Sequence, residues 1–271
     1  MAIDYTFTAK KIQSLETAYV LFSASTRLPF VECDPEDFYD QVYLYTEEEK
    51  AKNALKEYAE KQMPLITVKI DQKQMRVFLT SLHLIGVNLI VFDDGSDAIR
   101  IPLDEIAAMD PKLREKKDMP LINASLQLTT IYFLQELRRP NQNKADQARG
   151  QQLQELEEEM MANMVRSNFI LMLDASNVQK EPNSDNPNSG IQIPCIKAPN
   201  GDMFQPIFSD VREFQKFQQN PNSQMKMAAV PFRSLLGMLP PNAKGFVLNP
   251  SGVNLILSRE YLMAIAKRFE D

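Results

Sequence analysis

The sequence predicts a mixed α/β (α+β) fold in which one unit, a mixed sheet flanked by helices, occurs twice. Three apolar segments recur in the same order in both halves of the chain, and internal repetition of this kind indicates one structural unit used twice. The paired segments are residues 19–22 with 169–172, 42–47 with 205–210, and 89–93 with 245–249. A chain of 271 residues, 44% of them hydrophobic, is long enough for two domains of ordinary size.

The first strand of each unit is predicted to follow a helix, over residues 10–18 in one unit and 151–166 in the other. A second strand then leads directly into a helix. Thr46 and Ser209 stand where a hydroxyl can accept the first free amide of that helix, and Thr46-x-x-Glu49 has the spacing of a capping box. A phosphate site or a nucleophile is the alternative interpretation of these two hydroxyls.

A third strand, a further helix and a hairpin complete each predicted unit. The strand covers residues 65–70 or 226–230, and the helix follows around 75–79 or 232–236. The hairpins join 89–93 to 98–101 and 245–249 to 254–257. Their turns, at 93–96 and 249–252, contain the Asp, Asn, Pro and Gly residues that supply the dihedral angles of chain reversal. A helix is expected to follow each hairpin.

An apolar helix and a polar linker are predicted to join the two units. Asp118 is expected to cap a helix over residues 119–139, and Pro140 ends it before the linker 141–146. The predicted domains are therefore a first unit over 1–117, a connection over 118–149 and a second unit over 150–271. The segment 177–190 is rich in Pro, Asn and Ser and lacks periodicity, so it is interpreted as a mobile loop.

Composition argues against several classes of partner. The formal net charge is -6, from 30 basic and 36 acidic residues, which argues against nucleic acid because its recognition relies on clustered Lys and Arg. The first residues do not resemble a signal peptide, and no apolar run is long enough to span a bilayer, so a cytoplasmic protein is expected. Cys33 and Cys195 are expected to be reduced thiols rather than a disulfide or metal pair.

The residue types that carry catalysis are sparse, and we expect no catalytic, cofactor-binding or metal site. His83 is the one histidine of the sequence and stands among leucines, and the isolated glycines form no phosphate-binding loop. The acidic runs at 47–49 and 155–159 are interpreted as a helix start and a solvated helix face. The methionines at 160, 161 and 164 are expected to fill the core beneath a helix, with an adaptable binding surface as the alternative.

One stretch of the second half resembles a known family. The residues 204–209, Phe-Gln-Pro-Ile-Phe-Ser, precede Gly-Phe-Val-Leu-Asn-Pro at 245–250, and together they resemble the SseB N-terminal domain family (enhanced serine sensitivity protein SseB-like). In the first half the match rests on the order of elements, with Tyr45-Thr46 and the turn 93–96 at the equivalent places. The resemblance implies a tandem pair of SseB-like units. It brings no reaction and no ligand.

Two functions from different classes follow from these observations. The first is a non-catalytic bacterial interaction or regulatory protein that binds a protein partner or pairs with itself. The alternative is a small-ligand binding protein, with an amino acid as the ligand that the family name suggests, or a cryptic enzyme, with a pocket between the two units. A component of a secretion or membrane-associated assembly is a third possibility, which needs an exposed apolar patch.

Overall fold

The computed structural model describes residues 4–95, 97–109, 122–140, 147–174, 193–218 and 225–269. The chain divides into two compact units. Unit 1 takes in residues 1–113 and 124–160, and unit 2 takes in 114–123 and 161–271. Each unit is described on its own below.

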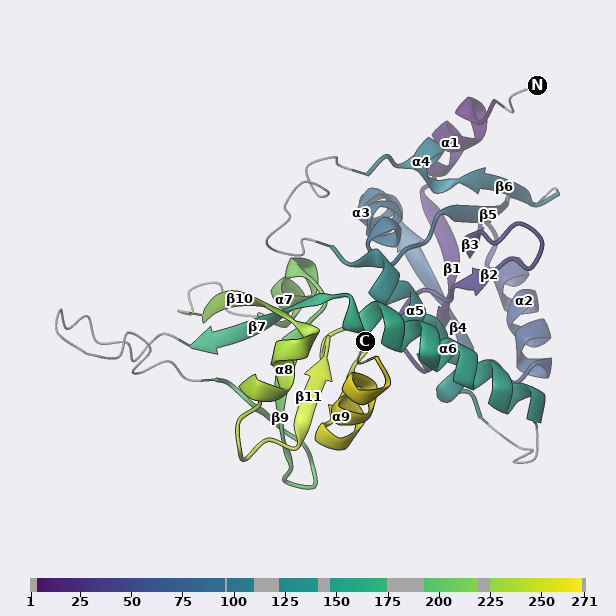
Figure 1. The fold of residues 1–271 in the computed structure, drawn as a ribbon. Helices are drawn as coiled ribbons and strands as arrows, with labels where there is room; N and C mark the ends of the chain where they lie inside the picture. The colour runs from purple at the N-terminus through teal and green to yellow at the C-terminus, as the bar shows by residue number, and fades with distance from the viewer. Residues whose placement is uncertain are drawn as a thin grey trace. The chain divides into compact units, whose positions relative to one another are not determined.

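Unit 1 contains a six-stranded sheet in the order β4-β1-β3-β5-β6, with the short strand β2 paired to β3 (Figure 1). Strands β3 and β5 run parallel, and the other neighbours are antiparallel. The strands are β1 (Thr17–Ser23), β2 (Glu32–Cys33), β3 (Asp40–Tyr45), β4 (Leu65–Asp71), β5 (Leu89–Asp93) and β6 (Ile99–Pro102). The helices are α1 (Thr6–Gln13), α2 (Glu48–Glu60), α3 (Gln72–Leu84), α4 (Leu103–Ile106), α5 (Ala124–Leu137) and α6 (Gln147–Val165), the last of which continues into unit 2.

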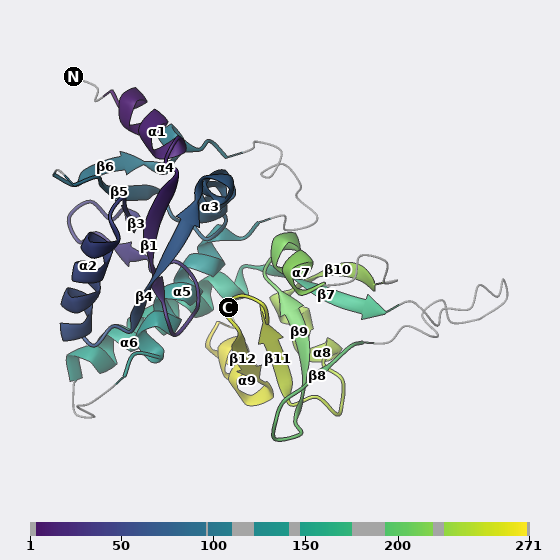
Figure 2. The same ribbon diagram turned by 180° about the vertical axis from the view of Figure 1, so that it is seen from behind.

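Unit 2 repeats this strand order as β10-β7-β9-β11-β12, with β8 paired to β9 (Figure 2). Its one parallel pair, β9 with β11, corresponds to β3 with β5. The strands are β7 (Asn168–Asp174), β8 (Ile196–Lys197), β9 (Met203–Phe208), β10 (Met225–Pro231), β11 (Gly245–Leu248) and β12 (Leu255–Ser258), and the helices are α7 (Val211–Phe217), α8 (Phe232–Met238) and α9 (Arg259–Arg268). The predicted fold class, two mixed sheets flanked by helices, is therefore confirmed.

Helices cover both faces of the unit 1 sheet, which explains the buried residues of its strands. Successive side chains of a strand point to opposite faces. In β1, Val20 and Leu21 are nevertheless both fully buried. Leu21 packs with Tyr45, Ala51 and Tyr58 on the α2 side, and Figure 1 shows α3 on the opposite side of the sheet. A strand buried on both faces loses the simple alternation of apolar and polar residues.

The start of the first unit differs from the prediction. Helix α1 ends at Gln13, whereas the predicted helix ran to residue 18. The reason is tertiary pairing, because Thr17 and Ala18 form a ladder with Asp71 and Ile70 of β4. Local helix propensity is weak beside such pairing. The two-residue strands β2 and β8 were not predicted, and at this length no periodicity could mark them.

The predicted caps are each wrong by one residue. The N-cap position of α2 is Glu47, without a side-chain cap bond, while the Thr46 amide donates to the Asp93 carbonyl oxygen at 3.0 Å. Helix α7 is capped by Asp210, whose Oδ1 accepts the Glu213 amide at 3.0 Å. The Asp210 carboxylate satisfies a free amide of the helix start as a hydroxyl would, so a side-chain cap of α7 was correctly expected but was assigned to the neighbouring residue.

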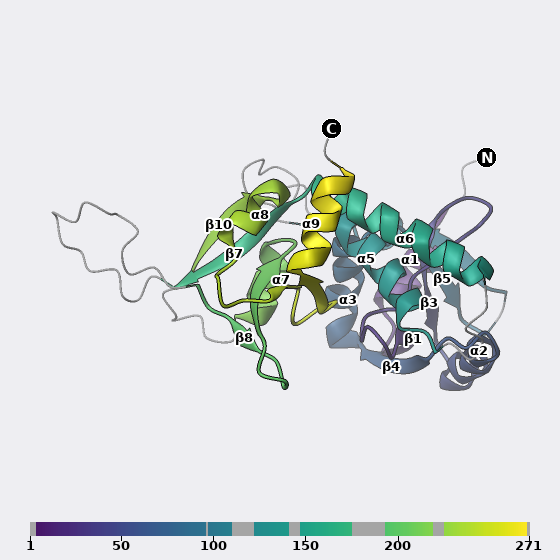
Figure 3. The ribbon, with the colours of Figure 1, turned by 60° about the horizontal axis from the view of Figure 1, so that its bottom comes forward.

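The predicted connection begins with a helix that belongs to unit 1. Helix α5 packs within that unit, with Leu126, Ile131 and Leu134 buried as expected, and ends shortly before Pro140. Figure 3 shows α5 and α6 side by side, and hydrogen bonds from Arg149 to Glu136 join them. Asp118, the linker 141–146 and the loop 177–190 lie outside the described residues. The domain boundaries at 117 and 149 stay a prediction.

Among the helices that the structure describes, none combines the length and the apolar character needed to cross a membrane.

Candidate functional site

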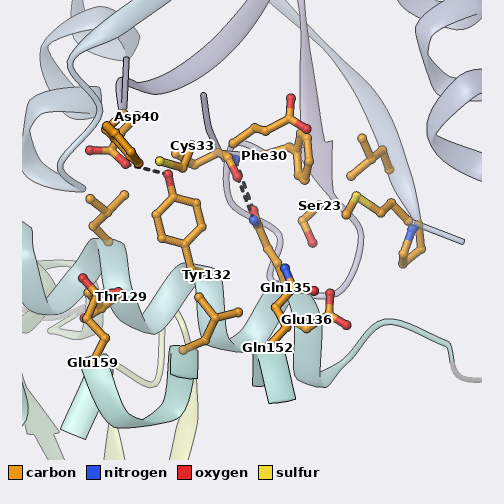
Figure 4. Close-up of a pocket in the computed structure, with 18 residues that line it drawn as sticks. Ser23, Phe30, Cys33, Asp40, Thr129, Tyr132, Gln135, Glu136, Gln152 and Glu159 are labelled. Atoms are coloured by element: carbon orange, nitrogen blue, oxygen red, sulfur yellow. Dashed lines mark hydrogen bonds between the residues drawn. The ribbon is translucent and has the colours of Figure 1, made fainter. Parts of the chain in front are cut away.

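A cavity of about 580 Å³ opens in unit 1 between the sheet and the helices α5 and α6 (Figure 4). This volume lies in the range of about 300–1,000 Å³ that is usual for ligand-binding pockets. We call it the unit 1 pocket. It is lined by Ser23, Phe30, Val31, Glu32, Cys33, Phe38, Asp40, Met63, Pro64, Leu65, Leu128, Thr129, Tyr132, Gln135, Glu136, Gln152, Leu156 and Glu159.

Helix α5 holds one wall of the pocket against the sheet through Tyr132 and Gln135. These residues are three positions apart and therefore share one face of the helix. The Gln135 carboxamide accepts the Val31 amide at 3.2 Å and donates to the Val31 carbonyl oxygen at 2.9 Å. The Tyr132 hydroxyl donates to Asp40 Oδ1 at 2.6 Å. Figure 4 shows both contacts as dashed lines across the pocket.

Asp40 and Tyr132 form a partly buried acid–phenol pair. Burial raises the pKa of Asp40 above its usual value, and the hydrogen bond from Tyr132 partly offsets that rise. Burial, and then the bond to the Asp40 carboxylate, raise the pKa of Tyr132 well above that of a free phenol. The phenol therefore stays protonated and serves as a donor, not as a base.

Glu32 also lines the pocket and is also held by phenols. Its side chain leaves the sheet on the face opposite to that of Asp40, because Glu32 pairs with Gln41 while Asp40 pairs with Cys33. Glu32 Oε2 accepts hydrogen bonds from the Tyr43 hydroxyl at 2.5 Å and from the Tyr58 hydroxyl at 2.8 Å. Burial raises the pKa of Tyr43 to about 12, and it raises the pKa of Tyr58 further. Two neutral donors thus orient this carboxylate without neutralising its charge.

Cys33 places an exposed thiol in the pocket. Burial raises its pKa, and the nearby carboxylates of Asp40 and Asp34 raise it further. The thiolate is the reactive form of cysteine, and a raised pKa keeps the group as a thiol near neutral pH. This environment is the opposite of the electropositive one that activates a catalytic cysteine.

The loop that follows Cys33 presents aromatic side chains at the pocket. Phe38 lines the pocket, is 74% exposed and has φ of 60°, an uncommon conformation for a bulky residue. The loop is fixed by Asp34, which accepts the Phe38 amide on its backbone oxygen at 3.0 Å. Arg100 pairs with Asp37 at 2.9 Å and with Asp34 at 3.4 Å. A residue keeps a strained conformation only where the surrounding contacts hold it there.

The residues that the sequence singled out lie mostly outside the pocket. His83 is buried in α3, with Nε2 2.5 Å from the Ala107 carbonyl oxygen. Glu48 and Glu49 occupy the first turn of α2, as the dipole argument predicts. Glu159 was assigned to a solvated helix face; it is exposed and also lines the pocket. Within the described residues, no cluster of His, Cys, Asp and Glu could hold a metal ion.

Two further predictions about single residues agree with the structure. Both cysteines are free, Cys33 exposed and Cys195 partly buried. Met160, Met161 and Met164 are buried, in accord with a role in the core.

A buried polar cluster in unit 2 accounts for the residues of the SseB-like pattern. Asn249 Oδ1 accepts the Ser209 amide, and Asn249 Nδ2 donates to Ser209 Oγ, both at 2.9 Å. The Ser209 hydroxyl in turn donates to Asp210 Oδ2 at 2.7 Å. Because β9 and β11 are parallel, the residues that follow them meet at one edge of the sheet. The cluster joins the two strand ends and the start of α7.

Residues 144–264 match the family model of the SseB protein N-terminal domain. This region is similar to that domain. The match covers most of unit 2 and does not include residues 1–117, so an SseB-like origin of unit 1 stays a prediction. At the equivalent place in unit 1, Asp93 accepts the Thr46 amide and pairs with Lys50 at 2.8 Å. An ion pair thus stands where unit 2 has its asparagine cluster.

Comparisons with other known proteins add little to the SseB match. No curated protein matches the chain. A structure of Tic22 from Plasmodium falciparum is 11% identical, with a TM-score of 0.23, and covers 96% of each chain. A structure of Anabaena Tic22 (protein transport) is 12% identical, with a TM-score of 0.22, and covers 97% of this chain and 98% of its own. TM-scores this low do not establish a shared arrangement, and no role is inferred from them.

Sequence reasoning missed the unit 1 pocket. Its polar residues on α5, Tyr132, Gln135 and Glu136, lie within the predicted helix, but only the apolar positions of that helix were used. The signal was available, because polar residues three or four positions apart inside an apolar helix share one face. What the sequence could not provide was the partner of each residue, since Val31 and Asp40 are far away along the chain.

Proposed function

We propose that this protein is a non-catalytic recognition protein that binds a partner polypeptide at the unit 1 pocket. The observation that carries the proposal is the exposed, conformationally strained Phe38 at a pocket whose loop is clamped by Asp34 and Arg100. A loop whose backbone is already fixed loses little freedom when the aromatic side chain that it presents is bound. Aromatic anchors of this kind are enriched where proteins bind one another.

The ionisable groups of the pocket support recognition rather than reaction. Tyr132 and Cys33 have raised pKa values and stay protonated near neutral pH. The Tyr132 hydroxyl donates its hydrogen bond to Asp40. A general base or nucleophile needs a pKa matched to the working pH. These groups instead supply a fixed pattern of donors and acceptors.

Site-specific photo-crosslinking tests this function. A photoreactive phenylalanine analogue is placed at position 38, and in a control protein at Phe7, which is 80% exposed on α1 of the same unit. In extracts of cells that make the protein naturally, we expect a discrete crosslinked partner from position 38 and not from position 7. Crosslinks that are equal at both positions, or absent from both, contradict the proposal.

The pocket volume favours one alternative function, the binding of a small molecule. A thermal-shift screen against amino acids and nucleotides distinguishes the two, because a ligand that binds only the folded state raises the melting temperature. A small molecule enclosed in the cavity stabilises the wild type and Phe38→Ala alike. A polypeptide that also covers Phe38 stabilises the wild type more.

A further inference from the structure

The charge of the unit 1 pocket is of one sign. Four carboxylates line it, on Glu32, Asp40, Glu136 and Glu159, and its lining includes no Lys, Arg or His. Glu136 is compensated by Arg139 at 2.7 Å and Arg149 at 2.6 Å. Within the described part of the chain, Glu32 and Asp40 have no such cation.

Glu32 and Asp40 are oriented and retain acceptor capacity. The hydrogen bonds to the Glu32 side chain reach Oε2, and the one to the Asp40 side chain reaches Oδ1. Among the described residues, no donor bonds Glu32 Oε1 or Asp40 Oδ2. An ionised carboxylate can accept about four hydrogen bonds, so each group can take a further donor without giving up its present ones.

The carboxylates also act on a neighbouring group of the pocket. The pKa of the Cys33 thiol is raised first by burial and then by carboxylates, including Asp40 and Glu159. Nearby negative charge disfavours formation of a thiolate, and it attracts a cation.

The remainder of the wall is apolar. Phe30, Val31 and Leu65 come from the sheet side, Leu128 and Leu156 from the helices, and Phe38 extends the apolar surface to the exposed loop. A bare amine would leave this surface uncovered, whereas a chain of alternating apolar and basic side chains covers it. Complementary charge then sets which partners can bind.

Resting on the proposed function, we infer that the partner segment is a basic amphipathic stretch of polypeptide. An arginine or lysine side chain of that segment binds Asp40, and an adjacent apolar side chain packs on Phe38. The stem of a long basic side chain can lie along the apolar wall while its head reaches the carboxylate.

Selection of random peptides on the intact protein tests this inference. Peptides displayed on phage are selected for binding to the wild type and depleted on Phe38→Ala. We expect the enriched sequences to carry Arg or Lys next to an apolar residue. Enrichment of neutral or acidic sequences overturns the charge inference but leaves the proposed function standing. No enrichment beyond the starting library overturns both.

An isosteric variant then locates the charge. For a selected peptide, Asp40→Asn keeps the acceptor for Tyr132 and removes the charge. We expect affinity to fall at least about tenfold in this variant, and to fall less than about twofold in the control Glu105→Gln, an exposed carboxylate on α4. Equal affinities of the wild type and Asp40→Asn, with melting temperatures unchanged, refute the inference.

Discussion

Arg149 of α6 donates a hydrogen bond from Nε to Glu136 Oε1 of α5 at 2.6 Å. The Nη2 atom of the same guanidinium donates to the Glu136 backbone carbonyl oxygen at 3.0 Å. The group also bonds the carbonyl oxygens of Arg139 and Pro140. One side chain thus satisfies free carbonyls at the end of α5 and pairs with a buried carboxylate. It fixes the helix that carries Tyr132 and Gln135.

We predict that Arg149→Lys destabilises the protein by about 2–4 kcal/mol, because an ammonium cannot reproduce the planar set of bonds that a guanidinium makes. Urea unfolding measures the loss. Arg76→Lys on the exposed face of α3 is the control, with an expected change below about 0.5 kcal/mol. Similar losses in both variants would show that the geometry at Arg149 is unimportant.

The asparagine cluster of unit 2 makes a second prediction. Asn249→Ala leaves the buried Ser209 amide without its acceptor, and we expect a loss of about 2–4 kcal/mol in unfolding free energy. Asn254→Ala is a matched control, since the φ values of Asn249 and Asn254 are 48° and 49°, while Asn254 is exposed. If backbone strain alone mattered, the two variants would lose equal unfolding free energy. A clearly larger loss in Asn249→Ala is therefore assigned to the buried hydrogen bonds of Asn249.

Gly245 makes a third prediction, at the start of β11. A Cβ atom there would lie 2.1 Å from the Leu257 carbonyl oxygen, which belongs to the neighbouring strand of the hairpin. Gly245→Ala should therefore cost more than about 4 kcal/mol or prevent folding of unit 2. Gly237→Ala in α8 meets no neighbour within 4 Å and should stabilise by about 0.5–1 kcal/mol. Melting temperatures of the two variants should move in opposite directions.

The raised pKa of Asp40 makes a prediction about pH. A carboxyl whose pKa is higher in the folded than in the unfolded state binds its proton more tightly when folded. Its stabilising contribution is present below the unfolded value, near 3.8, and is lost as pH rises through the folded pKa. The wild type should therefore lose stability relative to Asp40→Asn as pH rises from about 3.8 through the folded pKa.

Tyr132→Phe removes the hydrogen-bond donor that partly offsets the raised pKa of Asp40. The pKa of Asp40 should therefore increase further, and the loss of stability should extend to higher pH. Titration of the Asp40 carboxyl carbon by NMR measures both values. A pKa at or below 3.8 in the wild type, or a fall in Tyr132→Phe, contradicts the account.

The sequence predicted the main strands of both sheets because apolar runs and turn residues mark them locally. It did not predict the end of α1, because pairing of Ala18 with Ile70 overrides local preference. The cap residues were misassigned because Asp210 and Ser209 are adjacent and both are good capping types. The partners across the pocket could not be predicted, because the Tyr132–Asp40 contact joins residues 92 positions apart and leaves no periodic pattern in the sequence.

The residues of the two walls of the unit 1 pocket are synthesised at different times. The sheet side comes from positions 23–65, while the helical side comes from positions 128–159, after the sheet is complete at Pro102. Proteins are synthesised from the amino end and segments fold as they emerge. A ribosome-bound chain can thus assemble its first sheet while the cavity still lacks a wall, and recognition waits until residue 159 has left the exit tunnel.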